Sequence, residues 1–307
     1  MSTNKKIPSL PDELVPYPVV ANIGFGQGPI FDKEGNLFFA NYVKDGTIGR
    51  MSSNGTVEVW AHTGGQANGL WVDAYKNVVV ADVGGNDGRD GNSRLSRIHP
   101  VTRQLEVITD NYEGRQYGGI YAVCLDSDGT IYFSDPRGSS LENPIGAVYM
   151  VQMNSDNNPV NVIKVADGLA YPNGLAFYPG DESRFFVGEV QTRRILEYNR
   201  KSDGTLSNGR IVFEFPEIYI TFWGRHRQIA MSGFRFDEYN RLWVSRWPGS
   251  TVDVVDVDNG ELLASYEAGG EGVSNVCWWG DSIYATVANR HSIHRMHVGV
   301  CGAPTIP

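Results

Sequence analysis

Cysteine is scarce in this sequence: Cys124, Cys277 and Cys301 are the only three in 307 residues. That number is too small for a disulfide scaffold, and because no C-x-x-C pair exists, neither a zinc site nor a redox dithiol is indicated. Cys124 and Cys277 lie inside apolar runs, which predicts buried thiols. Cys301 lies in a tail rich in Gly and Pro, and a bond between Cys277 and Cys301 is left open.

Long apolar runs and an excess of basic charge are also missing. No stretch approaches the ~20 consecutive apolar residues of a membrane-spanning helix, so we expect no membrane partner. Lys and Arg number 26 against 35 Asp and Glu, a formal net charge of -9, which argues against binding to nucleic acid. The chain is nevertheless 41% hydrophobic and 11% aromatic, which excludes a disordered protein. The partner we expect is a small molecule, and the oligomeric state is left open.

The N-terminal segment, residues 1–11, is polar and lacks the apolar core of a signal peptide. A cytoplasmic location is therefore the default expectation. Secretion stays open for the case in which a signal has been removed.

One pattern recurs six times along the chain: an apolar strand, a polar turn and a second apolar strand. The copies span residues 26–42, 67–83, 121–136, 172–190, 231–247 and 273–289. Their turn positions, which are 41, 53, 52, 59 and 43 residues apart, are Asp32, Asp73, Asp126, Tyr178, Asp237 and Gly280. A period of ~40–50 residues with several strands per unit is typical of a β-propeller.

The repeat predicts an all-β fold, a six-bladed β-propeller with four-stranded antiparallel blades around a central channel. Turns of the D-x-x-G type, Asp32 to Gly35 and Asp126 to Gly129, supply the positive φ angle that a tight hairpin needs. No amphipathic helix longer than two turns is evident. The predicted organisation is an N-terminal extension or closing strand (1–19), one propeller domain (20–298) and a C-terminal tail (299–307).

Polar residues recur where the innermost strands of such a propeller would begin, at one mouth of the channel. The residue five before each turn position is Gln27, Asn68, Tyr121, Asn173, Ser232 or Asn275. The second strand of each hairpin returns to the same face, and its terminal residues are Asn41, Asp82, Asp135, Glu189, Arg246 and Asn289. Because buried polar groups are costly unless satisfied, these two rings predict a wet binding pocket. The alternative, that they are ordinary blade-locking residues, stays open.

Five motifs carry a family resemblance. They are N-Y-E-G-R (111–115), S-D-G-T-I-Y-F-S-D-P (127–136), Y-P-N-G-L-A-F (171–177), T-R-R-I (192–195) and D-G-T-L-S-N (203–208). Together they resemble the SMP-30/gluconolactonase/LRE-like family of six-bladed propellers. The resemblance covers nearly the whole chain, roughly residues 20–297.

The resemblance implies a divalent cation, often calcium, in the channel of the lactonase and phosphotriesterase-like members. Its ligands, from motifs E-G-P, P-N-D, P-N-G and D-G-M, correspond here to Gln27, Tyr121, Asn173 and Ser232, and only Asn173 matches. Both carboxylates are gone, and four neutral groups do not compensate a dication taken out of water. We therefore expect no metal and no cofactor. The alternative is weak Ca²⁺ binding, with Glu189 or Asp135 supplying the charge.

Other groups near the predicted mouth are candidates for chemistry. A buried carboxyl has a raised pKa and can serve as an acid or base, and an arginine can stabilise a developing oxyanion. The segment 219–228 is aromatic and basic in an acidic protein and resembles a lid over the pocket, although a pinned surface loop is the alternative. The predicted catalytic residues are Tyr121, Asp135, Glu189, His226 and Arg246. The predicted substrate-binding residues are Gln27, Asn68, Asp82, Asn173, Trp223, Ser232, Trp247 and Asn275.

The first function hypothesis is a metal-independent enzyme of secondary metabolism, a cyclase or pericyclase-like catalyst of the lyase or isomerase class. Some propellers resembling this family catalyse hetero-Diels–Alder reactions by dehydration and cycloaddition, and aromatic walls can pre-organise an apolar, oxygenated substrate. Two alternatives stay open. One is a lactonase or esterase with an altered cation site, and the other is a propeller that binds a small ligand without catalysis.

Overall fold

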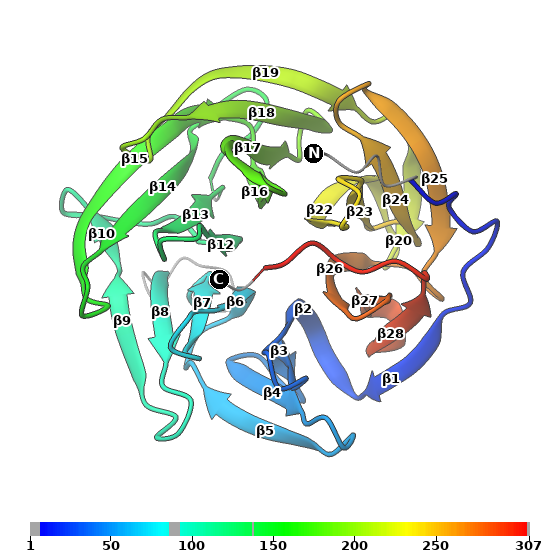
Figure 1. Ribbon diagram of the computed structural model, residues 1–307, viewed down its shortest axis with the longest axis horizontal. Coiled ribbons are helices and arrows are strands. Elements are labelled where there is room, and N and C mark those ends of the chain that lie inside the picture. Colours follow the sequence, from blue (N-terminus) through cyan, green and yellow to red (C-terminus); the bar gives the residue numbers. More distant parts are fainter. Residues whose placement is uncertain (1–6, 86–92, 137, 306–307) are drawn as a thin grey trace, which may run out of the picture.

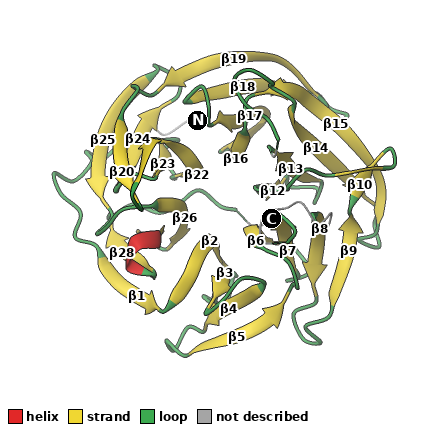
Figure 2. Ribbon diagram, turned by 180° about the vertical axis from the view of Figure 1, so that it is seen from behind, coloured by secondary structure: helices red, strands yellow, loops and turns green. Residues whose placement is uncertain are grey.

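Six four-stranded antiparallel sheets surround one central axis in the computed structural model, which describes residues 7–85, 93–136 and 138–305 (Figure 1). This is the six-bladed propeller that the repeat predicts. Figure 2 shows the same ring from behind, made almost wholly of strands. In the described ranges the one helical segment is η1 (Ala288–Arg290), and no helix is long and apolar enough to cross a membrane.

Within each of the first five blades, the strands follow chain order from the axis outwards. The first two blades are β2–β5 (Ile23–Phe31, Leu37–Tyr42, Thr47–Met51, Val57–His62) and β6–β9 (Ala67–Val72, Val78–Asp82, Arg94–Ile98, Leu105–Thr109). The next two are β12–β15 (Val123–Leu125, Ile131–Asp135, Gly146–Met153, Pro159–Leu169) and β16–β19 (Pro172–Tyr178, Asp181–Glu189, Arg194–Arg200, Leu206–Glu214). The fifth is β22–β25 (Ala230–Phe236, Leu242–Trp247, Thr251–Asp256, Glu261–Glu267). Two-stranded hairpins are formed by β10–β11 (Asn111–Tyr112, Arg115–Gln116) and β20–β21 (Tyr219–Phe222, Arg225–Gln228).

The sixth blade is built from both ends of the chain. Its strands are β26 (Val273–Trp279), β27 (Ser282–Val287), β28 (Ser292–His297) and, outermost, β1 (Tyr17–Ala21). Tyr17 pairs with Arg295 and Ala21 with Ser292, and Figure 1 shows blue β1 beside red β28. The N-terminal strand thus closes the ring and covers the edge that β28 would otherwise expose.

The hairpin turns between the two inner strands form for the reason the sequence indicates. Asp32 Oδ1 accepts hydrogen bonds from the backbone N–H groups of Glu34 (3.0 Å) and Asn36 (2.8 Å), and Gly35 has φ = 81°. The second blade repeats this arrangement at Asp73. The aspartate therefore satisfies turn donors that a strand pair leaves without a partner.

Glycines allow the inner strands of neighbouring blades to approach near the axis. Gly69 donates to the carbonyl oxygen of Tyr121 in the next blade (2.7 Å), and a Cβ on Gly69 would lie 2.6 Å from that oxygen. A Cβ on Gly174 would lie equally close to the carbonyl oxygen of Ser232. A glycine after the first-ring residue is therefore a packing requirement of the ring at these positions.

The core lies between neighbouring blades, where the two faces of each sheet are buried. Cys124 and Cys277 belong to it, as predicted, and burial raises the pKa of both thiols. All three cysteines are free, so Cys277 and Cys301 do not form a bond in this structure. The buried carboxylate of Asp237 is paired, since it accepts from Arg241 Nε (2.6 Å) and Trp243 Nε1 (3.0 Å).

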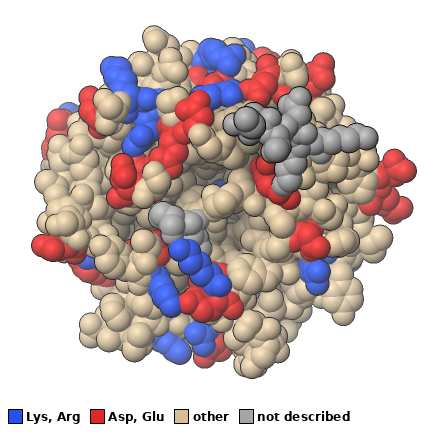
Figure 3. Space-filling view, in the orientation of Figure 1, with Lys and Arg blue, Asp and Glu red and all other residues tan. Residues whose placement is uncertain are grey.

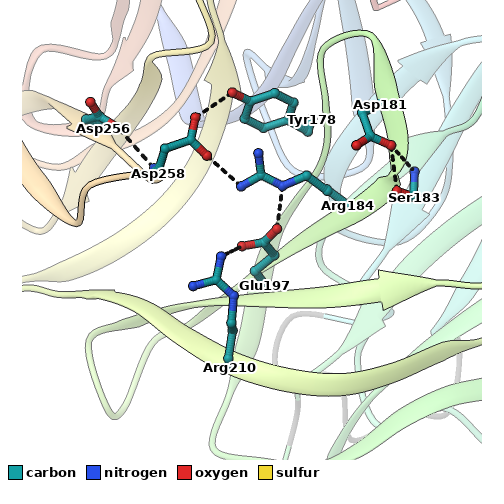
Figure 4. Close-up of polar contacts among 8 residues, drawn as sticks. All are labelled: Tyr178, Asp181, Ser183, Arg184, Glu197, Arg210, Asp256 and Asp258. Carbon is teal, nitrogen blue, oxygen red and sulfur yellow. Dashed lines mark hydrogen bonds and ion pairs between the residues drawn. The ribbon is translucent and has the colours of Figure 1, made fainter.

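A polar network on the outside joins the fourth and fifth blades (Figure 4). Arg184 on β17 donates to Asp258 (2.7 Å), between β24 and β25, and to Glu197 on β18 (2.5 Å), while Tyr178 donates to Asp258 (2.6 Å). Burial raises the pKa of Asp258, but the hydrogen bonds from Tyr178 and Arg184 outweigh it and hold that pKa below its usual value.

Replacing Asp258 by Asn should weaken this link between blades only modestly. The carboxylate is about half exposed, so we expect a loss of at most about 1 kcal/mol of unfolding free energy, most of it gone at high ionic strength. Urea unfolding at low and high salt measures this loss of unfolding free energy. The control is Asp181→Asn, whose carboxylate binds only Ser183 nearby. A loss that salt does not change would contradict an electrostatic role.

Candidate functional site

A cavity of about 490 Å³ occupies the end of the channel at which the inner strands begin. Its wall consists of Phe25, Gln27, Asn41, Gln66, Ala67, Asn68, Tyr121, Tyr171, Asn173, Val190, Gln191, Arg227, Gln228, Ala230, Met231, Ser232, Trp247 and Pro248. We call it the channel-mouth cavity. Five of the six first-ring residues predicted from the sequence line it, one from each of the first five blades: Gln27, Asn68, Tyr121, Asn173 and Ser232. The sixth, Asn275, lies off the wall, packed against Gly233, with its Oδ1 accepting from the Val276 N–H (2.8 Å).

The wall of the channel-mouth cavity is polar and almost uncharged. Seven of its side chains are carboxamides: Gln27, Asn41, Gln66, Asn68, Asn173, Gln191 and Gln228. Hydroxyl groups come from Tyr121, Tyr171 and Ser232, and Asn173 Nδ2 donates to Ser232 Oγ at 3.3 Å. Arg227 is the one charged side chain on the described wall. Such a surface offers both donors and acceptors to a neutral, oxygen-rich molecule.

The second ring of the sequence prediction does not line the cavity, apart from Asn41. Its carboxylates accept instead from backbone N–H groups. Asp82 binds the N–H of Gln66 (2.8 Å), Asp135 binds that of Gly119 (2.8 Å), and Glu189 binds that of Ala170 (2.7 Å). Each of these contacts fixes the loop that leads into an inner strand. The structure therefore places Asp82, Asp135 and Glu189 as loop-holding groups rather than acids or bases at the cavity wall.

Asn289 is exposed, and its amide reaches Glu271 at 3.5 Å. It makes no part of the wall either.

Arg246 also lies away from the cavity. Its guanidinium forms a buried ion pair with Asp253 on β24 and stands 3.8 Å from the centroid of the Phe215 ring. Burial lowers the pKa of Arg246, and Asp253 opposes that effect. The predicted role in stabilising an oxyanion is therefore not supported by its position, because the group is committed to the interior of the fifth blade.

The predicted lid is the β20–β21 hairpin, which packs beside the cavity through aromatic contacts. Trp223, 56% exposed at its tip, lies 6.1 Å from Phe25 and 6.0 Å from Trp247, and these two line the cavity. His226 is stacked on Tyr219 (ring centroids 4.9 Å apart) on the exposed side of the hairpin. Of the two residues predicted on this segment, Trp223 thus borders the cavity, and His226 points elsewhere.

Two groups of wall residues were not predicted from the sequence, besides Val190, Gln191 and Pro248, which follow second strands of the hairpins. The first group lies just before first-ring positions. Two residues before such a position stand Phe25, Gln66 and Tyr171, and Ala67 directly precedes Asn68. Since strand side chains alternate with period two, that spacing could have found them. Arg227 and Gln228 belong to the hairpin, which lies outside the repeat and therefore has no register to extend.

The donor set does not fit the divalent cation that the family resemblance implies. Gln27, Tyr121, Asn173 and Ser232 do converge on one cavity, but none is a carboxylate. A hard dication needs oxygen ligands that compensate its charge. Among the described residues, no three His, Cys, Asp or Glu side chains are grouped so as to hold a metal ion.

Comparison with known proteins places the fold in a family. The model of the SMP-30/Gluconolactonase/LRE-like region matches residues 25–289. The chain belongs to this family. A gluconolactonase of Zymomonas mobilis is 22% identical over 319 residues, covering 97% of this chain and 85% of the relative. The diisopropyl-fluorophosphatase of Loligo vulgaris is 24% identical over 272 residues, covering 79% and 78%.

Solved structures agree in fold. A gluconolactonase of Xanthomonas campestris superposes with a TM-score of 0.74 at 21% identity, covering 94% of this chain and 91% of the other. A luciferin-regenerating enzyme superposes with a TM-score of 0.75 at 18% identity, covering 96% and 100%.

These relatives correct the first function hypothesis. Their names are those of hydrolases, gluconolactonase and diisopropyl-fluorophosphatase, and an Aspergillus oryzae relative matching 39% of this chain is a lactonohydrolase. The prediction of a cyclase acting by cycloaddition in secondary metabolism is therefore wrong by the evidence of the family's members. The expectation of an enzyme agrees with relatives that are enzymes, and the lactonase alternative is the one they favour.

Proposed function

We propose that this protein is a hydrolase that opens a small, uncharged lactone in the channel-mouth cavity, without a divalent cation. The names of its relatives support the reaction class. The neutral wall of amides and hydroxyls supports an uncharged, oxygen-rich substrate. The observation that carries the proposal is Arg227: it lies on the wall, and its buried Nε has no hydrogen-bond partner among the described residues.

The reaction adds water to the lactone carbonyl carbon and breaks the ring C–O bond. The tetrahedral intermediate carries negative charge on the former carbonyl oxygen, and a positioned guanidinium in a partly dry cavity stabilises that charge. Amide N–H groups such as those of Asn173 and Asn68 hold the ring oxygens, and the Tyr121 hydroxyl supplies a further donor. The water proton goes to the leaving alkoxide, and the product is a hydroxy acid that releases a proton to solvent.

No general base faces this intermediate from the described wall, which contains no carboxylate and no imidazole. Stabilisation of the oxyanion is then the main contribution of the protein, and hydroxide or bulk water is the nucleophile. The rate should consequently follow hydroxide concentration rather than the titration of a side chain.

Purified protein should release acid from neutral lactones in a pH-stat assay. We expect kcat/KM to be unchanged by exhaustive chelation, because the described wall offers no carboxylate to a cation, and to rise with pH without an inflection from a carboxylate or imidazole. The comparison is a panel of neutral lactones against lactones bearing a carboxylate or an ammonium group. The neutral members should have the highest kcat/KM.

Loss of activity on chelation, with recovery on adding Ca²⁺, would overturn the metal-free chemistry.

A second candidate function, binding without catalysis, is favoured by the same lack of a base on the wall. It predicts that lactones bind, as measured by calorimetry, and that no acid is released above the uncatalysed rate.

A further inference from the structure

A second cavity, of about 230 Å³, lies at the opposite end of the channel. Single inner strands run from one cavity to the other: on β16, Asn173 lines the channel-mouth cavity and Phe177 lines the second cavity. Its wall is formed by the ends of inner strands, by turns and by the C-terminal segment Ala303, Pro304 and Thr305. Figure 1 shows that segment crossing the axis, and Figure 3 shows a hollow at the centre of the same face. We call it the channel-base cavity.

Arg235 lies on the wall of the channel-base cavity and is almost completely buried. Only 6% of it is exposed, and it follows Ser232 by three residues on β22, which places it about 10 Å further along the channel. Nη1 donates to the Phe234 carbonyl oxygen (2.8 Å), and the guanidinium carbon lies 4.9 Å from the Trp71 ring centroid. Nε is buried, with no hydrogen-bond partner among the residues that the structure describes.

Arg235 differs in one respect from the other buried arginines of its blade. Arg241 is paired with Asp237 at 2.6 Å, and Arg246 is paired with Asp253. Within the described ranges no carboxylate forms an ion pair with Arg235. A buried guanidinium stays protonated and is strongly unfavourable without a countercharge, and the described residues supply none.

The ionisable groups near Arg235 do not supply the missing countercharge. Cys124 and Cys277 act electrostatically on Arg235, and burial raises the pKa of each thiol, so both are neutral near pH 7. Asp126 and Glu182 are on the cavity wall, but Asp126 pairs with Arg200, and Glu182 accepts from the Ser127 N–H (2.8 Å). Two carboxylates at the wall also disfavour an anion of high charge.

We propose that the channel-base cavity binds one small monovalent anion, of the halide or nitrate type, against the Arg235 guanidinium. Arg235 lines this cavity, so its guanidinium is the donor group that an anion there would meet, and the guanidinium carbon lies 4.9 Å from the Trp71 ring centroid. The largely apolar wall, with Leu125, Phe177 and Phe236, strengthens the attraction by excluding water. The anion would take the place that Asp237 and Asp253 take beside the neighbouring arginines.

The first test is thermal unfolding in increasing sodium bromide, with sodium glutamate as the larger balancing anion at constant ionic strength. A ligand that binds only the folded state raises the midpoint in a saturable manner. We expect such a rise in the wild type and in the exposed-hairpin control Arg225→Met, and none in Arg235→Met. An equal rise in Arg235→Met would overturn the proposal.

The second test does not depend on a variant. Crystals of the wild-type protein soaked in bromide should show an anomalous peak in the channel-base cavity, within hydrogen-bond distance of the Arg235 guanidinium. A soaked crystal that shows bromide only at surface sites, and none beside Arg235, would overturn the proposal.

Discussion

Replacing Arg227 by Gln should lower kcat for lactone hydrolysis by about 10²- to 10³-fold, the effect of removing one oxyanion donor from a preorganised site. The side chain is the one charged group on the described wall of the channel-mouth cavity, and no ion pair with a described carboxylate diverts it. Gln keeps an N–H donor and most of the volume, so KM should change much less than kcat. Steady-state kinetics on the best neutral lactone measure both constants.

The matched control is Arg225→Gln. Arg225 belongs to the same strand, β21, but is exposed and does not line the cavity. It should retain wild-type kcat, which separates the local effect from a change in overall charge. Equal losses in both variants would mean that hairpin stability matters rather than Arg227, and an unchanged Arg227→Gln would remove the guanidinium from the proposed chemistry.

The fold could be predicted because the repeat is a consequence of local chemistry. The turns at Asp32 and Asp126 use an aspartate acceptor and a glycine at positive φ, and both are visible in the sequence. The counted spacing then fixes how many hairpins surround the axis. The sequence leaves open whether residues 1–19 are an extension or a closing strand, because pairing between distant segments, Tyr17 with Arg295, is not encoded in local pattern.

The first ring of the site could be predicted for a related reason. The position five residues before each turn reaches the cavity in five of the six blades, so register alone predicted residues such as Gln27 and Asn173. The prediction that the second ring lines the cavity was wrong, because register gives the position of a side chain but not its hydrogen-bond partner. The loops entering the inner strands carry free backbone donors, and the nearest carboxylates, such as Asp135 and Glu189, satisfy them.

The roles of two arginines also could not be predicted from spacing. The sequence has Arg227 in an insertion and Arg246 at a repeat position, and the repeat therefore predicts Arg246 as the arginine of the site. In the structure Arg246 forms an ion pair with Asp253 on the neighbouring strand of the same blade, whereas a separate hairpin carries Arg227 to the cavity. Which arginine meets a carboxylate depends on tertiary packing that no spacing reveals.

Replacing Arg246 by Met should lower the free energy of unfolding by about 3–5 kcal/mol, because the substitution leaves Asp253 buried without its countercharge. For a chain of this size the thermal midpoint should fall by about 10 °C, which circular dichroism can follow. The contact with the Phe215 ring is lost as well. Per folded molecule, lactone hydrolysis should be unchanged, since Arg246 does not line the channel-mouth cavity.

The matched control is the double variant Arg246→Met, Asp253→Leu. An apolar pair of similar volume in place of a buried ion pair is often neutral or stabilising, so the double variant should recover most of the lost stability. The other partners of Asp253, Thr251 and Ser265, are partly or fully exposed and can turn to water. An Arg246→Met protein of wild-type stability that no longer hydrolyses lactones would contradict this assignment and return Arg246 to the chemistry, because a purely structural ion pair affects folding and not turnover.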